Sequence, residues 1–336
     1  MSRRRAYVSC GGDRTIRVFA LETDGALRPV SVVPIPGPGD SSSSSPLALA
    51  PDRRFLYAAL RAPPFPLTSF AINPADGDLT PIAEANLPDS MAYIATDRTG
   101  RWLLGASYPG ALVAVHAIDA DGGIRSAATQ VIATPPKAHC ILPAPSGEFV
   151  YATSLGGDAV LRWRLEPEGL DESSRRSTRL RAGAGPRHLA FAGDGTLYCL
   201  NELDATLDVL TEDVNSDTLI VRQTLRLLEG EGKRAAADLH LTPDGRLLFA
   251  SERTSNALYG FRTAPDGATL TPLGATPCEA TPRGFAIDPD GRFLLCAGQT
   301  ANAVGTYTID PTSGELTRLG QYPTGPNPNW IEIVDL

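Results

Sequence analysis

The sequence lacks a long apolar run and has few cysteines. No stretch of about 18 consecutive apolar residues occurs, which excludes a membrane-spanning helix. Residues 6–12, near the start, are too few and too polar for the hydrophobic segment of a signal peptide. The five cysteines are scattered and show no Cys-x-x-Cys spacing, which is typical of reduced thiols. We therefore expect a cytoplasmic protein with no membrane partner.

Positive charge is also scarce. The chain has 38 acidic against 30 basic residues, a net charge of −8. An acidic chain without a basic run repels nucleic acid, so we expect no nucleic-acid partner. Only Lys137 and Lys233 are lysines, which makes arginine the default cation here. A single arginine is therefore weaker evidence of a binding site than it is in most sequences.

The usual signatures of metal and cofactor chemistry are missing. The chain contains no His-x-His, His-Glu-x-x-His or Gly-x-Ser-x-Gly, and no glycine-rich phosphate loop leading into a helix. The recurring Asp-Gly pairs are interpreted as hairpin turns, because no periodic series of aspartates accompanies them as a calcium loop requires. We expect no metal and no cofactor.

What the sequence does contain is a repeat. A turn of the type Pro-Asp-Gly-Arg, followed by three apolar residues, recurs along the chain, as in Pro243-Asp244-Gly245-Arg246. A more divergent copy is Gly193-Asp194-Gly195. The copies end at Tyr57, Leu104, Tyr151, Tyr198, Phe249 and Leu295, which are 46 to 51 residues apart, and Tyr7 marks a seventh copy without its turn. Such spacing indicates a repeat architecture.

A second glycine-bearing turn follows in most units, as in Asp24-Gly25 and Asp266-Gly267. Two hairpins in each unit of about 47 residues predict a four-stranded blade, and seven blades close a ring. The first unit lacks its innermost strand, whereas a surplus strand follows the last unit at residues 329–334. We therefore predict an all-β fold in one domain over residues 1–336: a seven-bladed β-propeller closed by the C-terminal strand joining the N-terminal blade.

Aligning the units places polar residues in register. The first rim position, eight residues before the turn glycine at the start of the innermost strand, is occupied by Pro46, Ala92, His139, Arg187, Ala237 and Arg283. The second rim position, four residues after the end of each triplet, is occupied by Arg61, Tyr108, Leu155, Glu202, Arg253 and Gln299. Because the two strands involved run antiparallel, both positions face the same mouth of the channel.

These positions give the candidate site. His139 and Glu202 form a candidate acid/base pair, and Arg187, Arg253, Arg283 and Gln299 are candidate substrate-binding residues around it. The alternative is that such residues are merely solvated by channel water. We interpret His116 and His188 as structural histidines and leave His240 undecided between the two roles.

Several longer motifs carry a resemblance. Residues 183–188 (Gly-Ala-Gly-Pro-Arg-His), 236–246 (Ala-Ala-Asp-Leu-His-Leu-Thr-Pro-Asp-Gly-Arg) and 281–285 (Thr-Pro-Arg-Gly-Phe) are similar to the bacterial propeller-type 6-phosphogluconolactonases and their relative, the carboxymuconate lactonising cycloisomerase. The resemblance implies catalytic roles for His139 and Glu202 and carboxylate binding by Arg187 and Arg253. Arg283 matches a motif shared among the lactonases. The proline-rich residues 61–66 depart from the pattern.

Three functions follow as hypotheses. The first is a lactonase that hydrolyses the δ-lactone of an anionic sugar acid, with Glu202 or His139 as general base. The second is a lyase or isomerase of the cycloisomerase type, which moves a proton to or from carbon without consuming water. The third is a non-catalytic propeller that binds a partner or metabolite.

Overall fold

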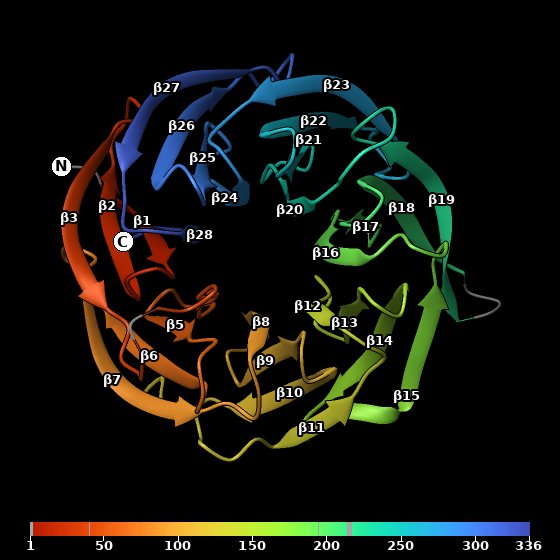
Figure 1. Ribbon diagram of the computed structural model, residues 1–336. Coiled ribbons are helices and arrows are strands. Elements are labelled where there is room, and N and C mark those ends of the chain that lie inside the picture. The colour runs from red at the N-terminus through yellow and green to blue at the C-terminus, as the bar shows by residue number, and fades with distance from the viewer. Residues whose placement is uncertain (1–2, 40, 194, 214–216) are drawn as a thin grey trace.

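The computed structural model describes residues 3–39, 41–193, 195–213 and 217–336. Seven four-stranded antiparallel sheets are arranged as blades around a central axis (Figure 1). The predicted seven-bladed propeller is therefore confirmed. Asp194, in the most divergent copy of the repeat turn, lies outside the described residues. Within the described part of the chain, no helix is long and apolar enough to cross a membrane.

The blades are numbered in chain order, and the innermost strand of each is given first. Blade 1 contains β28 (Pro328–Asp335), β1 (Arg4–Cys10), β2 (Thr15–Leu21) and β3 (Leu27–Pro34). Blade 2 contains β4 (Leu47–Leu49), β5 (Phe55–Ala59), β6 (Pro66–Ile72) and β7 (Leu79–Asn86). Blade 3 contains β8 (Met91–Thr96), β9 (Trp102–Ser107), β10 (Leu112–Ala117) and β11 (Gln130–Ala133).

Blade 4 contains β12 (Ala138–Pro143), β13 (Phe149–Ser154), β14 (Ala159–Glu166) and β15 (Gly169–Arg179). Blade 5 contains β16 (Pro186–Phe191), β17 (Leu197–Asn201), β18 (Thr206–Asp213) and β19 (Thr218–Arg226). Blade 6 contains β20 (Ala236–Leu241), β21 (Leu247–Glu252), β22 (Ala257–Thr263) and β23 (Leu270–Pro277). Blade 7 contains β24 (Pro282–Ile287), β25 (Phe293–Gly298), β26 (Ala303–Ile309) and β27 (Leu316–Pro323).

The C-terminal strand closes the ring as predicted. β28 pairs antiparallel with β1, and Tyr7 lies opposite Glu332. Arg4 at the start of β1 forms ion pairs with Asp335 of β28 at 2.6 Å and with Asp290 of blade 7 at 3.0 Å. The pairing removes two exposed strand edges, and the arginine ties the closed blade to its neighbour.

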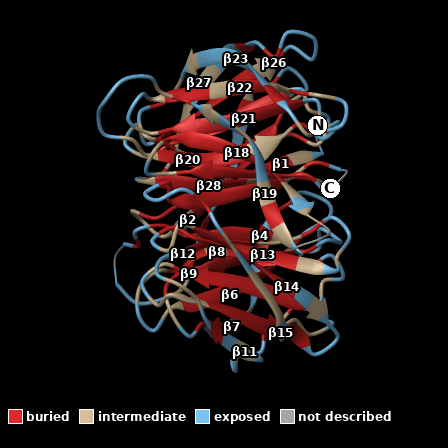
Figure 2. Cartoon of the chain, turned by 90° about the vertical axis from the view of Figure 1, so that its right-hand side faces the viewer, coloured by how far each residue is buried: buried red, intermediate tan, exposed pale blue. Residues whose placement is uncertain are grey.

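The hydrophobic core lies between the blades. Each of seven buried clusters draws its side chains from two neighbouring blades; Tyr7, Leu56 and Phe70, for example, pack between blades 1 and 2. Tyrosines of the repeat also form hydrogen bonds between neighbouring blades. The hydroxyl of Tyr198 in blade 5 donates to the carbonyl of Gly267 in blade 6 at 2.7 Å. In the edge-on view the strands are largely buried and the exposed loops gather along both ends of the ring (Figure 2). Residues near the axis are therefore held by a rigid scaffold.

Candidate active site

In six of the seven blades, a β-bulge places the residue at the first rim position of the innermost strand. In blade 5, Pro186 pairs with Asn201 and His188 with Leu200, so Arg187 between them has no partner in the ladder. The same irregularity occurs near the start of the innermost strand in blades 1, 3, 4, 6 and 7. A bulge re-aims a side chain that regular alternation would hold against a neighbouring strand.

The register corrects one predicted position. In blade 2, Leu47 pairs with Ala58 as Leu239 pairs with Ala250 in blade 6, so Ser45 and not Pro46 occupies the first rim position. The shift arises at the turn, where Arg53, at a left-handed φ of 60°, takes the place of the glycine. In blade 1 the equivalent residue is Asn329 of β28, since Trp330 pairs with Ser9.

Each residue at the second rim position follows the end of the second strand of its blade, as Glu202 follows β17 and Gln299 follows β25. The backbone N–H of Glu202 donates to the carbonyl of Gly185 at 2.7 Å, and that of Gln299 donates to Thr281 at 2.9 Å. These bonds hold the chain beside the start of the innermost strand of the same blade. The structure thus brings both sets of predicted residues to one mouth of the channel.

Glu202 is held between two arginines. Its Oε2 lies 2.9 Å from Nε of Arg187, and its Oε1 lies 3.0 Å from Nη2 of Arg253. The arginines are fixed in turn by backbone carbonyls, because Arg187 donates to Ala237 and Arg253 Nε donates to Ala235 at 3.0 Å. Burial raises the pKa of Glu202, but the two guanidinium groups outweigh it and hold the pKa below its ordinary value. Glu202 is therefore a carboxylate, and both of its oxygens are engaged.

His139 lies in a strongly positive environment. Burial lowers the pKa of His139 well below its ordinary value, and Arg187 and Arg283 lower it further. The ring of Tyr108 meets the imidazole edge-on, with centroids 6.0 Å apart, and Nδ1 of His139 is buried with no hydrogen-bond partner in the described part of the chain. His139 is thus neutral near pH 7, with one ring nitrogen free to bond a ligand.

Arg283 and Arg61 add positive charge without a carboxylate partner. Burial lowers the pKa of Arg283 to about 9, and neighbouring arginines, Arg61 among them, contribute to the shift. Sequence reasoning missed Arg61, although its second rim position could have identified it. Its Nε donates to Oγ of Ser90 at 3.0 Å and its Nη1 to Oγ of Ser44 at 3.2 Å. Within the described residues, neither Arg61 nor Arg283 forms an ion pair.

Gln299 lies at the rim but is partly occupied. Its Nε2 donates to Oδ1 of Asn327 in the loop before β28. The predicted residue is thus present at the mouth, with its amide nitrogen engaged by the protein. The thiol of Cys140, which follows His139 in β12, lies in the core, and burial raises its pKa to about 12.

Aromatic rings close the channel below the rim. The residues that directly follow the first rim position on the innermost strands form what we call the floor ring. Three of its members, Tyr93, His188 and Trp330, meet near the axis. The ring centroids of Tyr93 and Trp330 are 4.9 Å apart, and those of Tyr93 and His188 are 5.2 Å apart. The site is therefore a cup closed at its base.

A small cavity of about 10 Å³ lies at the base of this cup, room for about one water molecule. Its lining combines rim residues and floor-ring residues: Ser44, Ala92, Arg187, His188, Asp238, Arg283, Asn329 and Trp330. Sequence reasoning missed the part that His188 and Asp238 play here. Within the described residues, no group of three or more histidine, cysteine or acidic side chains is arranged to hold a metal ion.

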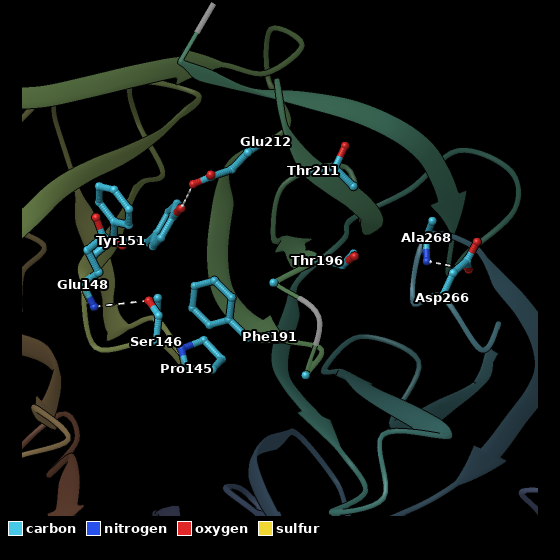
Figure 3. Close-up of a pocket in the computed structure, with 14 residues that line it drawn as sticks. Pro145, Ser146, Glu148, Tyr151, Phe191, Thr196, Thr211, Glu212, Asp266 and Ala268 are labelled. Carbon is cyan, nitrogen blue, oxygen red and sulfur yellow. Dashed lines mark hydrogen bonds between the residues drawn. The ribbon is translucent and has the colours of Figure 1, made fainter. Parts of the chain in front are cut away.

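An open cleft of about 740 Å³ lies at the other end of the ring, between turns of blades 4, 5 and 6 (Figure 3). Its walls include Glu148, Glu212 and Asp266, and Glu212 accepts a hydrogen bond from the hydroxyl of Tyr151 at 2.5 Å. Glu148 and Glu212 are paired with Arg164 and Arg162, and no arginine or lysine is among the described residues that line the cleft, so it offers an anionic ligand no free positive charge. The arginine-rich cup is the stronger candidate.

Comparison with known proteins agrees with this fold. Residues 5–333 match the family model described as "Lactonase, 7-bladed beta-propeller". The chain is 37% identical over 288 residues to 6-phosphogluconolactonase of Serratia proteamaculans, covering 84% of each chain. The Yersinia pestis protein of the same name is 36% identical over 290 residues, covering 85% of this chain and 84% of that one.

Solved structures agree. Periplasmic gluconolactonase of Pseudomonas aeruginosa superposes with a TM-score of 0.89 at 28% identity, covering 98% of this chain and 99% of that one. A putative 6-phosphogluconolactonase of Bacteroides fragilis gives a TM-score of 0.88 at 25% identity, covering 99% and 98%. The resemblance inferred from the motifs is confirmed: the chain belongs to the seven-bladed β-propeller lactonase family.

Proposed function

We propose that the protein hydrolyses the δ-lactone of 6-phosphogluconic acid, or of a closely similar phosphorylated sugar acid, in the arginine-rich cup. The observation that carries this proposal is the local charge. Four arginines, Arg61, Arg187, Arg253 and Arg283, gather around two carboxylates, Glu202 and Asp238, which leaves a surplus of positive charge in a chain whose net charge is −8. His139 is neutral and adds no charge. A phosphate monoester brings about −1.5 to −2 charges at pH 7, close to what this surplus requires.

The arginines divide into two kinds. Arg187 and Arg253 are paired with Glu202 and held by backbone carbonyls, so their positions are set before a ligand arrives. Within the described residues Arg61 and Arg283 form no ion pair, so their charge is available to the phosphate. Arg283 can bond the phosphate oxygens bidentately, whereas Nε and Nη1 of Arg61 already bond Ser90 and Ser44. An arginine beside the lactone carbonyl would also stabilise the oxyanion that forms during attack by water.

His139 and Glu202 are proposed to contact the reacting ring. The neutral imidazole of His139 can donate a hydrogen bond to the leaving ring oxygen or accept one from water. Glu202 is ionised, but its two ion pairs weaken it as a base, which favours a role in orienting the arginines and the sugar hydroxyls. General acid–base groups of this kind typically contribute a factor of about 10²–10⁴ to the rate.

The test is a direct comparison of two lactones at constant pH, following acid release and subtracting the uncatalysed rate. We expect kcat/KM to be at least ~100-fold higher for 6-phosphogluconolactone than for gluconolactone, because charge-assisted hydrogen bonds contribute about 1.5–3 kcal/mol each. Arg61→Met should reduce that preference, whereas Arg54→Met, on an exposed turn, should leave it unchanged. Equal kcat/KM for the two lactones would refute the assignment of the phosphate.

A further inference from the structure

Asp238 of the floor ring is a buried carboxylate with an unusually complete set of donors. Its Oδ1 lies 2.7 Å from Nδ1 of His188 and accepts from the backbone N–H of Leu239 at 2.9 Å. Its Oδ2 lies 3.1 Å from Nε2 of His240 and accepts from the N–H of Phe285 at 2.9 Å. Burial raises the pKa of Asp238, but the two histidines outweigh it and hold the pKa well below its ordinary value. The carboxylate is therefore charged and fixed by three blades.

This arrangement sets the tautomer of His188. Because a carboxylate only accepts hydrogen bonds, Nδ1 of His188 carries the proton and Nε2 carries the lone pair. Nε2 is buried and has no hydrogen-bond partner among the described residues. Buried polar atoms are normally satisfied, and His188 lines the cavity that has room for about one water molecule. A water molecule there would give Nε2 its missing partner.

We propose that His188, oriented by Asp238, is the general base that activates the hydrolytic water from the floor of the cup. The proposal rests on the lactone hydrolysis proposed above and names the residue that starts it. Neither sequence-predicted candidate is as well supported in this role. Both oxygens of Glu202 are engaged by arginines, and within the described residues no carboxylate faces His139 to stabilise an imidazolium.

The step balances without a cofactor. His188 Nε2 takes a proton from water as the water oxygen bonds to the lactone carbonyl carbon, and the carbonyl π electrons move to oxygen beside the arginines. When the carbon–ring oxygen bond breaks, the ring oxygen receives that proton and becomes the hydroxyl of the product. The imidazole is neutral again, and the new carboxylic acid releases its proton to solvent. Asp238 stabilises the transient imidazolium, as a buried carboxylate does for a catalytic histidine elsewhere.

The surroundings of His188 define the pH dependence. Burial and Arg187 lower the pKa of His188 to about 4, against the opposing effect of Asp238. The other polar and charged side chains around it are Tyr93 of β8, His139 of β12, His240 of β20 and Arg283 of β24. Glu332 of β28 acts on the neighbouring His240 and Asp238. A base must be neutral to accept a proton, so kcat/KM should fall as the pH drops through about 4.

His116 provides a matched control. Like His188, it is buried, its Nδ1 is engaged (by the carbonyl of Arg125 at 3.1 Å), and its Nε2 has no partner among the residues that the structure describes. It lies in β10, away from the cup, and has no carboxylate beside it. Replacement by asparagine suits both sites, because the asparagine side-chain amide can keep the bond made by Nδ1 while the basic Nε2 is lost.

The experiment compares His188→Asn, Asp238→Asn and His116→Asn with the wild type, using 6-phosphogluconolactone and separating lactone from acid by chromatography between pH 3.5 and 8. We expect His188→Asn to lower kcat by ~100-fold or more with KM changed less than ~3-fold. The variant should also lose the fall in kcat/KM near pH 4, which is the acid limb of the pH profile. Asp238→Asn should lower kcat by ~10-fold or more and move the limb to lower pH. His116→Asn should match the wild type.

The outcomes separate the two proposals. If the wild type does not hydrolyse the phosphorylated lactone, the proposed function fails. If the wild type is active and His188→Asn keeps kcat within ~3-fold, or keeps the acid limb, the assignment of the base is overturned. An acid limb that disappears only in Glu202→Gln would move that role to Glu202. Should His188→Asn not fold by circular dichroism, His188→Gln and the limb shift in Asp238→Asn decide the matter.

Discussion

Replacing Glu202 with glutamine tests the electrostatic design of the cup. The substitution keeps the shape of the side chain but removes the only carboxylate between Arg187 and Arg253. Removing one partner of a buried ion pair typically costs about 3–5 kcal/mol. Here the cost should be smaller, because Glu202 is 22% exposed and glutamine keeps one acceptor oxygen. We expect the free energy of unfolding to fall by about 2–4 kcal/mol.

The assay is equilibrium unfolding in urea, with and without inorganic phosphate. Glu148→Gln is the matched control, because Glu148 pairs with Arg164 on the surface, where both side chains are nearly half exposed. Exposed pairs of this kind contribute about 0–1 kcal/mol. Phosphate should stabilise Glu202→Gln more than the wild type, since the variant has one more uncompensated positive charge and binds the anion in its folded state.

The pH dependence has a definite sign. The pKa of Glu202 is lower in the folded than in the unfolded chain, so its contribution to stability is complete above its ordinary pKa and is lost as the pH falls through the folded value. The difference between wild type and variant should therefore be largest near neutral pH and shrink in acid. Unfolding curves of Glu202→Gln and Glu148→Gln that coincide at pH 7, or equal stabilisation by phosphate, would refute the reasoning.

Four further outcomes follow from the structure. His139→Ala and Glu202→Gln should each lower kcat by ~10²-fold or more, and the double variant should be little worse than the poorer single, because the two act on one step. Arg187→Ala and Arg253→Ala should chiefly raise KM in steady-state kinetics, if the charge they bind does not change during reaction. Truncation after Pro328 removes most of β28 and should leave an aggregated or unfolded chain by circular dichroism and gel filtration. Activity should survive dialysis against a strong chelator, and a loss restored by one divalent ion would contradict the metal-independent mechanism.

The fold could be predicted from the sequence because a propeller repeats one structural unit, the four-stranded blade, seven times. The turn glycines and the triplets that follow them gave the period, and the surplus strand near Trp330 predicted the closure that β28 makes with β1. The two rim positions followed from the same register, because antiparallel pairing alone places them at one end. His139, Arg187, Glu202 and Arg253 could therefore be grouped without knowledge of any contact.

The floor of the cup was not accessible in this way, for two physical reasons. Strict alternation along a strand predicts that residues next to the rim positions face away from them, whereas a bulge changes the direction of both. Two of the ring contacts of His188 also come from distant blades, with Tyr93 on blade 3 at 5.2 Å and Trp330 on blade 1 at 6.2 Å. No local pattern in the sequence encodes such a meeting across the axis. Arg61 is a different case, since its second rim position was recognised from the sequence and only its serine partners, Ser44 and Ser90, required the structure.

The division between scaffold and site explains how the protein tolerates its buried charge. The apolar clusters lie between the blades, whereas the surplus arginines lie near the axis, where backbone carbonyls and serine hydroxyls hold them. Fixed, partly dehydrated positive charges bind an anion strongly because they need no reorganisation when it arrives. Beneath them, Asp238 keeps a single negative charge where an imidazolium would form. The cup therefore separates the two electrostatic demands of lactone hydrolysis, with positive charge at the rim for the substrate and negative charge at the floor for the base.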